Sequence, residues 1–200
     1  MIRPLRVVGL DLSTAATGIA ATHASTGEPH LWATVLNTSK RPLHTQTDII
    51  DVAVRRACGY GSGNRPLSAV GVDLVVIEGT FSRGSASDYP LHHVRAVVTQ
   101  WLARQRIAYV DVQPGTLKIW ATGSGSMRGD SKVTKDDVVA SIIATYGRLL
   151  NIAPDDNVCD AVGLLSMGLA AYGQELAEVP ESHRRALKSV RWPDLQAVSA

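Results

Sequence analysis

A run of mostly apolar residues at 70–78, which ends in Glu78, constrains the fold of this 200-residue chain more than any other feature of its sequence. Its length and its Val and Ile content predict a β-strand. An apolar run without strict alternation is typical of a central strand that is covered on both faces. The sequence therefore predicts a sheet with a carboxylate at the end of its central strand.

Similar patterns along the chain predict the other elements. Apolar runs predict strands at 5–12, 18–23, 31–36 and 107–112. Helical spacing predicts helices at 45–56, 91–106, 116–122, 133–146 and 158–172. The order of these elements indicates an α/β sheet in which the first three strands are antiparallel and the later ones parallel.

The organisation indicated by the composition is a single domain at residues 1–175, followed by a polar C-terminal tail at 176–200. The two cysteines form no CxxC pair, which is the usual situation in a reducing compartment. The N-terminal residues do not resemble a signal peptide, and the apolar stretch at 161–173 is too short to span a bilayer. We therefore expect a cytoplasmic protein without a membrane segment.

The charge of the chain is almost balanced but unevenly distributed. A formal net charge of +2 excludes a histone-like polycation that binds nucleic acid by bulk charge. Residues 104–135 hold six Lys or Arg and two acids, whereas residues 136–181 hold eight acids and one Arg. The basic segment is either a local groove for nucleic acid or a solvated loop whose charges serve solubility.

Three acidic residues stand where predicted elements end or begin. Asp11 lies inside the first strand, Glu78 ends the central strand, and Asp160 opens an apolar helix. A carboxylate beside a buried strand is costly to desolvate unless it is paired or binds a metal, and clustered oxygen ligands suit Mg²⁺ or Mn²⁺. The alternatives are local: Asp11 caps a turn, Glu78 pairs with Arg83 or Arg95, and the acids near Asp160 stabilise a helix start.

Four segments resemble motifs of the RuvC-type Holliday-junction resolvases. The first is GLDLSTAATG at 9–18, and the second is VIEGTF at 76–81. The segment 117–138 is similar to the basic region before the penultimate helix, and DNVCDA at 156–161 resembles the last motif. The chain is most similar to the phage-borne members, and the resemblance extends over residues 7–172.

This resemblance implies a ribonuclease-H-like fold, with a central mixed five-stranded sheet flanked by helices. It implies a homodimer that uses two Mg²⁺ ions, for which Mn²⁺ can substitute, to resolve four-way DNA junctions by paired symmetrical nicks. The setting would be the cytoplasm of a bacterial cell or of a phage-infected host. Two alternatives stay open: a catalytically weak junction-binding protein, and a related nuclease of the same fold that acts on other branched DNA or RNA.

The resemblance also assigns the metal ligands and catalytic acids to Asp11, Glu78 and Asp160. The best-known members carry a second acid three residues before the last one, where this chain has the neutral Asn157. Asn157 is the aligned fourth ligand and part of the catalytic set, and Asp156 is a possible substitute because it lies one helical turn before Asp160.

The DNA contacts implied by the resemblance come from the basic segment and the loop after the central strand. One lysine, which we assign as Lys132, is expected to stabilise the transition state and joins the catalytic set. Phe81 is expected to stack on a base at the opened junction, although it could instead close the end of the strand as a hydrophobic plug. The predicted DNA-binding residues are Phe81, Arg83, Lys118, Arg128, Lys132 and Lys135.

Overall fold

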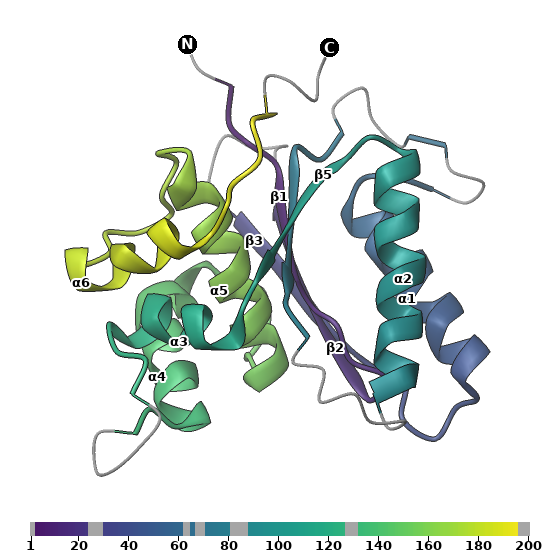
Figure 1. Cartoon of the computed structure of the whole chain (residues 1–200), viewed down its shortest axis with the longest axis horizontal. Coiled ribbons are helices and arrows are strands. Elements are labelled where there is room, and N and C mark those ends of the chain that lie inside the picture. The colour runs from purple at the N-terminus through teal and green to yellow at the C-terminus, as the bar shows by residue number, and fades with distance from the viewer. Residues whose placement is uncertain are drawn as a thin grey trace.

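A five-stranded mixed sheet forms the centre of the molecule (Figure 1). The computed structural model describes residues 3–23, 30–61, 65–66, 71–80, 88–126 and 132–195. The strands are β1 (Val7–Asp11), β2 (Ala16–His23), β3 (His30–Asn37), β4 (Leu74–Glu78) and β5 (Ala108–Val112). Their order is β3-β2-β1-β4-β5, with β1, β2 and β3 antiparallel and β1, β4 and β5 parallel, so the predicted fold class is confirmed.

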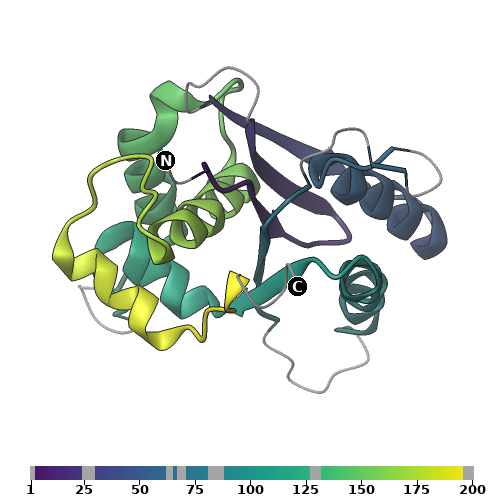
Figure 2. The ribbon, with the colours of Figure 1, turned by 90° about the horizontal axis from the view of Figure 1, so that it is seen from above.

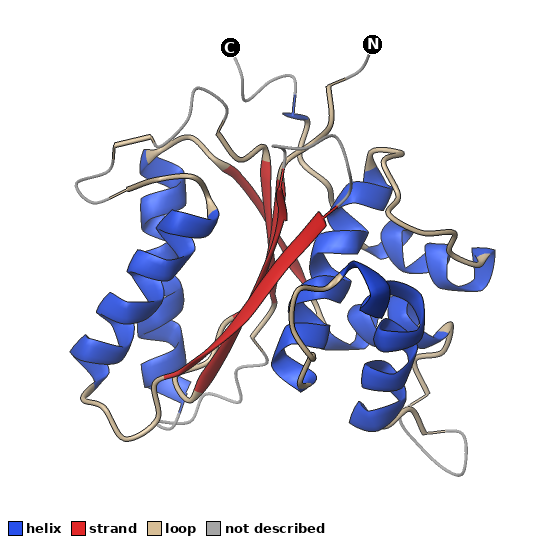
Figure 3. Ribbon diagram, turned by 180° about the vertical axis from the view of Figure 1, so that it is seen from behind, coloured by secondary structure: helices blue, strands red, loops and turns tan. Residues whose placement is uncertain are grey.

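Helices cover both faces of this sheet (Figure 3). One face carries α1 (Leu43–Ala57) and α2 (Tyr89–Arg104). The other carries α3 (Pro114–Thr122), α4 (Lys135–Tyr146) and α5 (Asp156–Ala171). Helix α1 begins two residues before the predicted helix, with Pro42 and not a threonine side chain at its N-cap. No helix among the described residues is both long and apolar enough to cross a bilayer.

Strand β4 explains why its sequence is continuously apolar. Its side chains alternate between two cores, because successive residues of a strand point to opposite faces. Leu74 and Val76 pack in the core beneath α5, whereas Val75 and Ile77 pack in the core beneath α1 and α2. All four side chains are fully buried, as the central-strand prediction requires.

Helix α5 lies unusually close to the sheet. A Cβ atom added to Gly9 of β1 would lie 2.0 Å from the carbonyl oxygen of Ala161. One added to Gly18 of β2 would lie 2.0 Å from the carbonyl oxygen of Asn157. Only glycine fits at these two positions, so the sequence itself sets the distance between the first turns of α5 and the strands beneath them.

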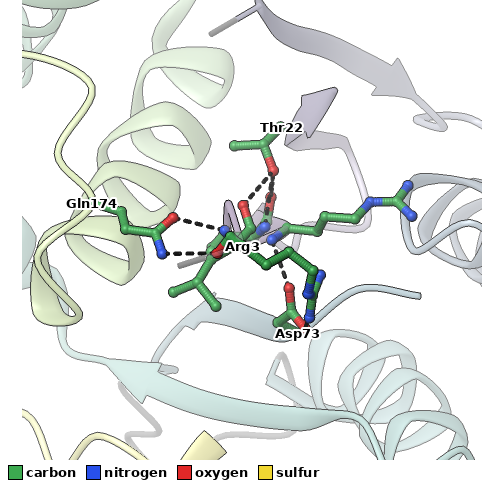
Figure 4. A network of polar contacts seen from close by, with 7 residues as sticks. Arg3, Thr22, Asp73 and Gln174 are labelled. Atoms are coloured by element: carbon green, nitrogen blue, oxygen red, sulfur yellow. Dashed lines mark hydrogen bonds and ion pairs between the residues drawn. The ribbon is translucent and has the colours of Figure 1, made fainter. Parts of the chain in front are cut away.

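The opposite end of α5 is tied to the start of β1 by polar contacts (Figure 4). The Gln174 side chain, just beyond α5, accepts a hydrogen bond from the Leu5 amide at 2.7 Å and donates one to the Arg3 carbonyl at 3.2 Å. Asp73, just before β4, accepts from the Arg6 amide at 2.8 Å and pairs with the Arg3 guanidinium. These contacts link β1, β4 and α5 at the end of the sheet where β1 and β4 begin.

The segment at 176–195, which we expected to be part of a polar tail, packs against the domain. It forms α6 (Glu181–Arg184) and a 3₁₀ helix, η4 (Arg185–Ser189), that lie along α3 (Figure 2). Val179 and Ala186 are buried in the core beneath α5. Its apolar residues are interspersed with polar ones, so the average composition did not indicate a packed segment. Residues 196–200 lie outside the described part of the chain.

The close approach of α5 gives a first test. We expect Gly9→Ala to lower the free energy of unfolding by about 1–3 kcal/mol, because the new methyl group would push backbone atoms of α5 away from β1. Urea denaturation monitored by circular dichroism measures this change. Gly71→Ala is the matched control, since nothing lies within 4 Å of a Cβ at that position. Equal losses in the two variants would contradict the interpretation.

Candidate active site

Three carboxylates meet at the ends of two parallel strands. Asp11 is the last residue of β1 and Glu78 the last of β4, and the parallel register pairs Gly9 with Val76. Both side chains point to the α5 face, because each follows its neighbour on that face by two residues. Asp160 comes from the second turn of α5, which covers this end of the sheet.

Burial gives these carboxylates unusual proton affinities. Asp11 is 8% exposed, and burial together with the nearby Glu78 raises its pKa to about 8. Burial and the charge of Asp11 raise the pKa of Asp160 to about 7. The pKa of Glu78 is also raised, first by burial and then by the charge of Asp160. A hydrogen bond between the Asp11 and Glu78 side chains contributes to the raised pKa of Asp11.

Two lysines face this acidic cluster. Lys118 of α3 and Lys135 of α4 line a hollow of about 280 Å³ together with Glu78 and Asp160. The positive charges of both lysines lower the pKa values of Glu78 and Asp160, partly offsetting the effect of burial. A negatively charged group that entered the hollow would meet both ammonium groups beside the carboxylates.

The two residues expected as alternative fourth ligands lie at the start of α5 and contact each other. The amide nitrogen of Asn157 donates a hydrogen bond to Oδ1 of Asp156 at 3.0 Å. The Oδ2 atom of Asp156 pairs with the ammonium group of Lys135, and this hydrogen bond lowers the pKa of Asp156. Asp155 is the N-cap and accepts a hydrogen bond from the Val158 amide at 2.9 Å, so one acid of this cluster has a local role in the helix start.

Lys132 does not line the hollow that contains Glu78 and Asp160. This exposed residue lines another hollow, with Thr122, Asp137 and His183 among its neighbours. Lys135, three residues further along the chain, is the lysine that lies beside Glu78 and Asp160. It is the first residue of α4, and its side chain reaches Asp156 of α5. Three further predicted DNA contacts, namely Phe81, Arg83 and Arg128, lie outside the described residues.

Arg95 supports the end of β4 in a way that the sequence did not predict. The sequence indicated it as a possible partner for the Glu78 carboxylate. The structure shows one guanidinium nitrogen donating to the Glu78 carbonyl oxygen at 3.0 Å, while another pairs with Asp111 of β5. A guanidinium therefore joins β4 to β5 directly behind the Glu78 side chain.

Gly9 and Gly18 also position the site, and a sequence motif marks both of them. Both belong to the segment that resembles the first motif of the resolvases, but neither was assigned a role. Their lack of side chains allows the start of α5, and with it Asp160, to approach Asp11.

A hard divalent cation fits the chemistry of this donor set, since its ligating atoms are all oxygen. Such an ion would favour the charged forms of carboxylates that burial and mutual repulsion otherwise disfavour. Within the described residues, no three His, Cys, Asp or Glu side chains are gathered closely enough to hold an ion in the arrangement seen. Asp11 and Glu78, whose side chains contact each other, are the residues of this cluster that would hold such an ion.

Comparison with solved structures shows that this fold occurs in other proteins. No family model matches the sequence. The structure is similar to that of RuvC from Thermus thermophilus, with a TM-score of 0.58 and 18% identity over 88% of this chain and 100% of that one. The same protein in complex with a Holliday junction substrate gives a TM-score of 0.58 and 17% identity over 88% of this chain and 99% of that one.

A viral protein shares the architecture as well. The fowlpox virus Holliday junction resolvase gives a TM-score of 0.52 and 8% identity, over 84% of this chain and 99% of that one. At these identities the likeness establishes a common fold. The chain therefore has the ribonuclease-H-like fold of the RuvC and Holliday junction resolvases, as the sequence motifs predicted.

The raised pKa values lead to a test by pH. A carboxyl whose pKa is higher in the folded state than its usual value near 4 binds more protons when folded, so stability falls as pH rises through this interval toward 8. We expect the free energy of unfolding in EDTA to fall between pH 5 and pH 8 by at least about 1 kcal/mol more in the natural protein than in Asp11→Asn. Urea denaturation at the two pH values measures both slopes, and equal slopes would show that Asp11 is not responsible.

The guanidinium contact behind Glu78 gives a separate test. We expect Arg95→Gln to lower the free energy of unfolding by about 1–3 kcal/mol, because it leaves the half-buried Glu78 carbonyl and Asp111 without their charged partner. Arg104→Gln, an exposed position near the end of the same helix, serves as the control. Denaturation curves that shift equally for both variants would argue against this role.

Proposed function

We propose that this chain is a metal-dependent, structure-selective DNA endonuclease that resolves four-way junctions by paired symmetrical nicks. The observation that carries the proposal is the convergence of Asp11, Glu78 and Asp160, from three separate elements, beside Lys118 and Lys135. Carboxylates with adjacent cations suit phosphodiester hydrolysis better than a purely structural role. The fold shared with a RuvC that was solved with a Holliday junction substrate supports branched DNA as the substrate.

The residues of the site divide the chemistry between them. Mg²⁺, or Mn²⁺ in its place, would be held by Asp11, Glu78 and Asp160, and would supply an activated water and charge neutralisation at the phosphate. The raised pKa values of Asp11 and Glu78 mean that a bound cation would favour their anionic forms. Lys118 and Lys135 stabilise negative charge that develops on the phosphate oxygens. Hydrolysis joins a water oxygen to phosphorus and breaks the bond to the 3′ oxygen, which leaves a 5′-phosphate end.

The other predicted contacts bind the DNA around the active site. Lys132, Arg128 and Arg83 would bind phosphates around the site, and Phe81 would stack on a base at the opened centre of the junction. A homodimer would place two sites on two opposed strands, as symmetrical nicking requires. The setting that we propose is the cytoplasm of a bacterial cell or of a phage-infected host, which is what the resemblance of the sequence motifs implies.

The decisive experiment is a cleavage assay with purified full-length protein, Mg²⁺, a labelled four-way junction and a linear duplex of the same sequence. We expect paired nicks in the junction and none in the duplex. Asp11→Asn and Glu78→Gln should each lower the rate about a hundredfold or more while leaving junction binding intact, because each removes an anionic ligand. Lys188→Gln, at an exposed position of η4 outside the basic segment, should cleave at the natural rate.

One observation favours a second candidate function, a junction-binding protein without cleavage. The neutral Asn157 stands where the best-known resolvases have an acid, so the site holds less negative charge than theirs. Tight and selective junction binding without nicks in either Mg²⁺ or Mn²⁺ would establish this alternative and refute the enzyme.

A further inference from the structure

The carboxylate of Asp156 is engaged through both of its oxygen atoms. Oδ1 accepts the hydrogen bond from the Asn157 amide nitrogen at 3.0 Å, and Oδ2 pairs with the Lys135 ammonium group. Each oxygen keeps a second lone pair, but a metal ion bound there would lie beside the Lys135 ammonium group, and the two positive charges would repel each other. Asp156 is therefore held as a partner of Lys135 in this arrangement.

Asn157 offers little in its place. Its amide nitrogen is used in the contact with Asp156, which leaves a neutral carbonyl oxygen as its one ligand-type atom. Among the described residues at the start of α5, Asp160 is the carboxylate that shares the hollow with Glu78 and forms no ion pair. A second divalent ion at this end of the site would have one anionic ligand and one neutral one.

Lys135 places a positive charge in the hollow beside Asp160. It is the first residue of α4, and it lines the hollow with Glu78 and Asp160. The charges of Asp156, Asp160 and Asp11 all raise the pKa of its ammonium group, so it is charged at neutral pH. About 60% of its side chain is exposed, so the ammonium group can contact a phosphate that enters the hollow.

We propose that the ammonium group of Lys135, held by Asp156, takes the place of a second metal ion. The site would bind one divalent cation, at Asp11 and Glu78 with Asp160, and Lys135 would supply the other positive charge to the scissile phosphate. This inference rests on the proposed nuclease function and changes its expected cofactor requirement from two ions to one. Asp156 is then a positioning residue for Lys135 and not a metal ligand.

The test counts bound Mn²⁺ on the full-length protein without DNA, because bound Mn²⁺ loses the solution electron paramagnetic resonance signal. We expect one ion per chain in the natural protein and one in Lys135→Arg, which keeps the charge. Lys135→Ala frees Asp156 and should bind two. Lys135→Ala combined with Asp156→Ala should return to one, since the second ion of the single variant depends on that carboxylate.

Lys188→Ala is the matched control for the loss of a positive charge, since it removes an exposed lysine of η4 and should bind one ion. Circular dichroism melting curves confirm that each variant is folded. Two ions in the natural protein would overturn the role of Lys135 and leave the nuclease proposal standing. A single ion in Lys135→Ala would overturn it as well. No bound ion in any variant would overturn both this inference and the metal-dependent nuclease.

The dependence of junction cleavage on Mn²⁺ gives a second readout. The natural protein should respond to Mn²⁺ with a Hill coefficient near one. Lys135→Ala should cleave about a hundredfold more slowly at low Mn²⁺, regain part of the rate at high Mn²⁺, and show a steeper response. A loss that high Mn²⁺ does not relieve would show that Lys135 does not stand in for an ion.

Discussion

The absence of side chains at Gly9 and Gly18 is the constraint on which the rest of the site depends. Backbone carbonyls of α5 lie where the Cβ atoms of any other residues would be. This contact fixes the height of α5 above β1 and β2, and therefore the distance from Asp160 to Asp11. The spacing of the three carboxylates is in this sense a steric consequence of the two glycines.

The same geometry forces like charges together at a buried end of the sheet. Alternation along β1 and β4 turns Asp11 and Glu78 to one face, and α5 closes over them with a third acid. The resulting rise in their pKa values is a cost to the folded state in the absence of a cation. Stability given up in this way is typical of sites that are organised for binding before the ligand arrives.

Much of this arrangement could be predicted from the sequence, because strand patterns and strand ends are local. The apolar run that ends in Glu78 identified the central strand, and the motifs placed Asp11 and Asp160 at the same edge. The catalytic role of Lys132 stays a prediction. Lys135 lines the hollow with Glu78 and Asp160 because α4 begins there, after a capping box between Thr134 and Asp137 that the sequence pattern did not indicate.

The packing of residues 176–195 could not be predicted, for a different physical reason. Its stability comes from contacts with α3, which is distant in sequence, and its own composition is polar. Arg95 was likewise considered as a side-chain partner of Glu78, whereas its observed partner is a backbone carbonyl, which every residue possesses and which no sequence pattern marks. Contacts between distant parts of the chain and hydrogen bonds to backbone carbonyls are therefore the two features that the sequence does not predict.

The contacts of the segment after α5 influence the order in which the chain folds during synthesis. His183 contacts the Trp120 carbonyl at 2.8 Å, and Arg185 donates to the Gly123 carbonyl at 2.8 Å, so the C-terminal end of α3 is closed by residues synthesised much later. A nascent chain that has emerged only as far as α4 holds Asp11, Glu78 and both lysines of the hollow, but it lacks α5 and Asp160. The acidic cluster therefore assembles only after α5 has been synthesised, because Asp160 belongs to that helix.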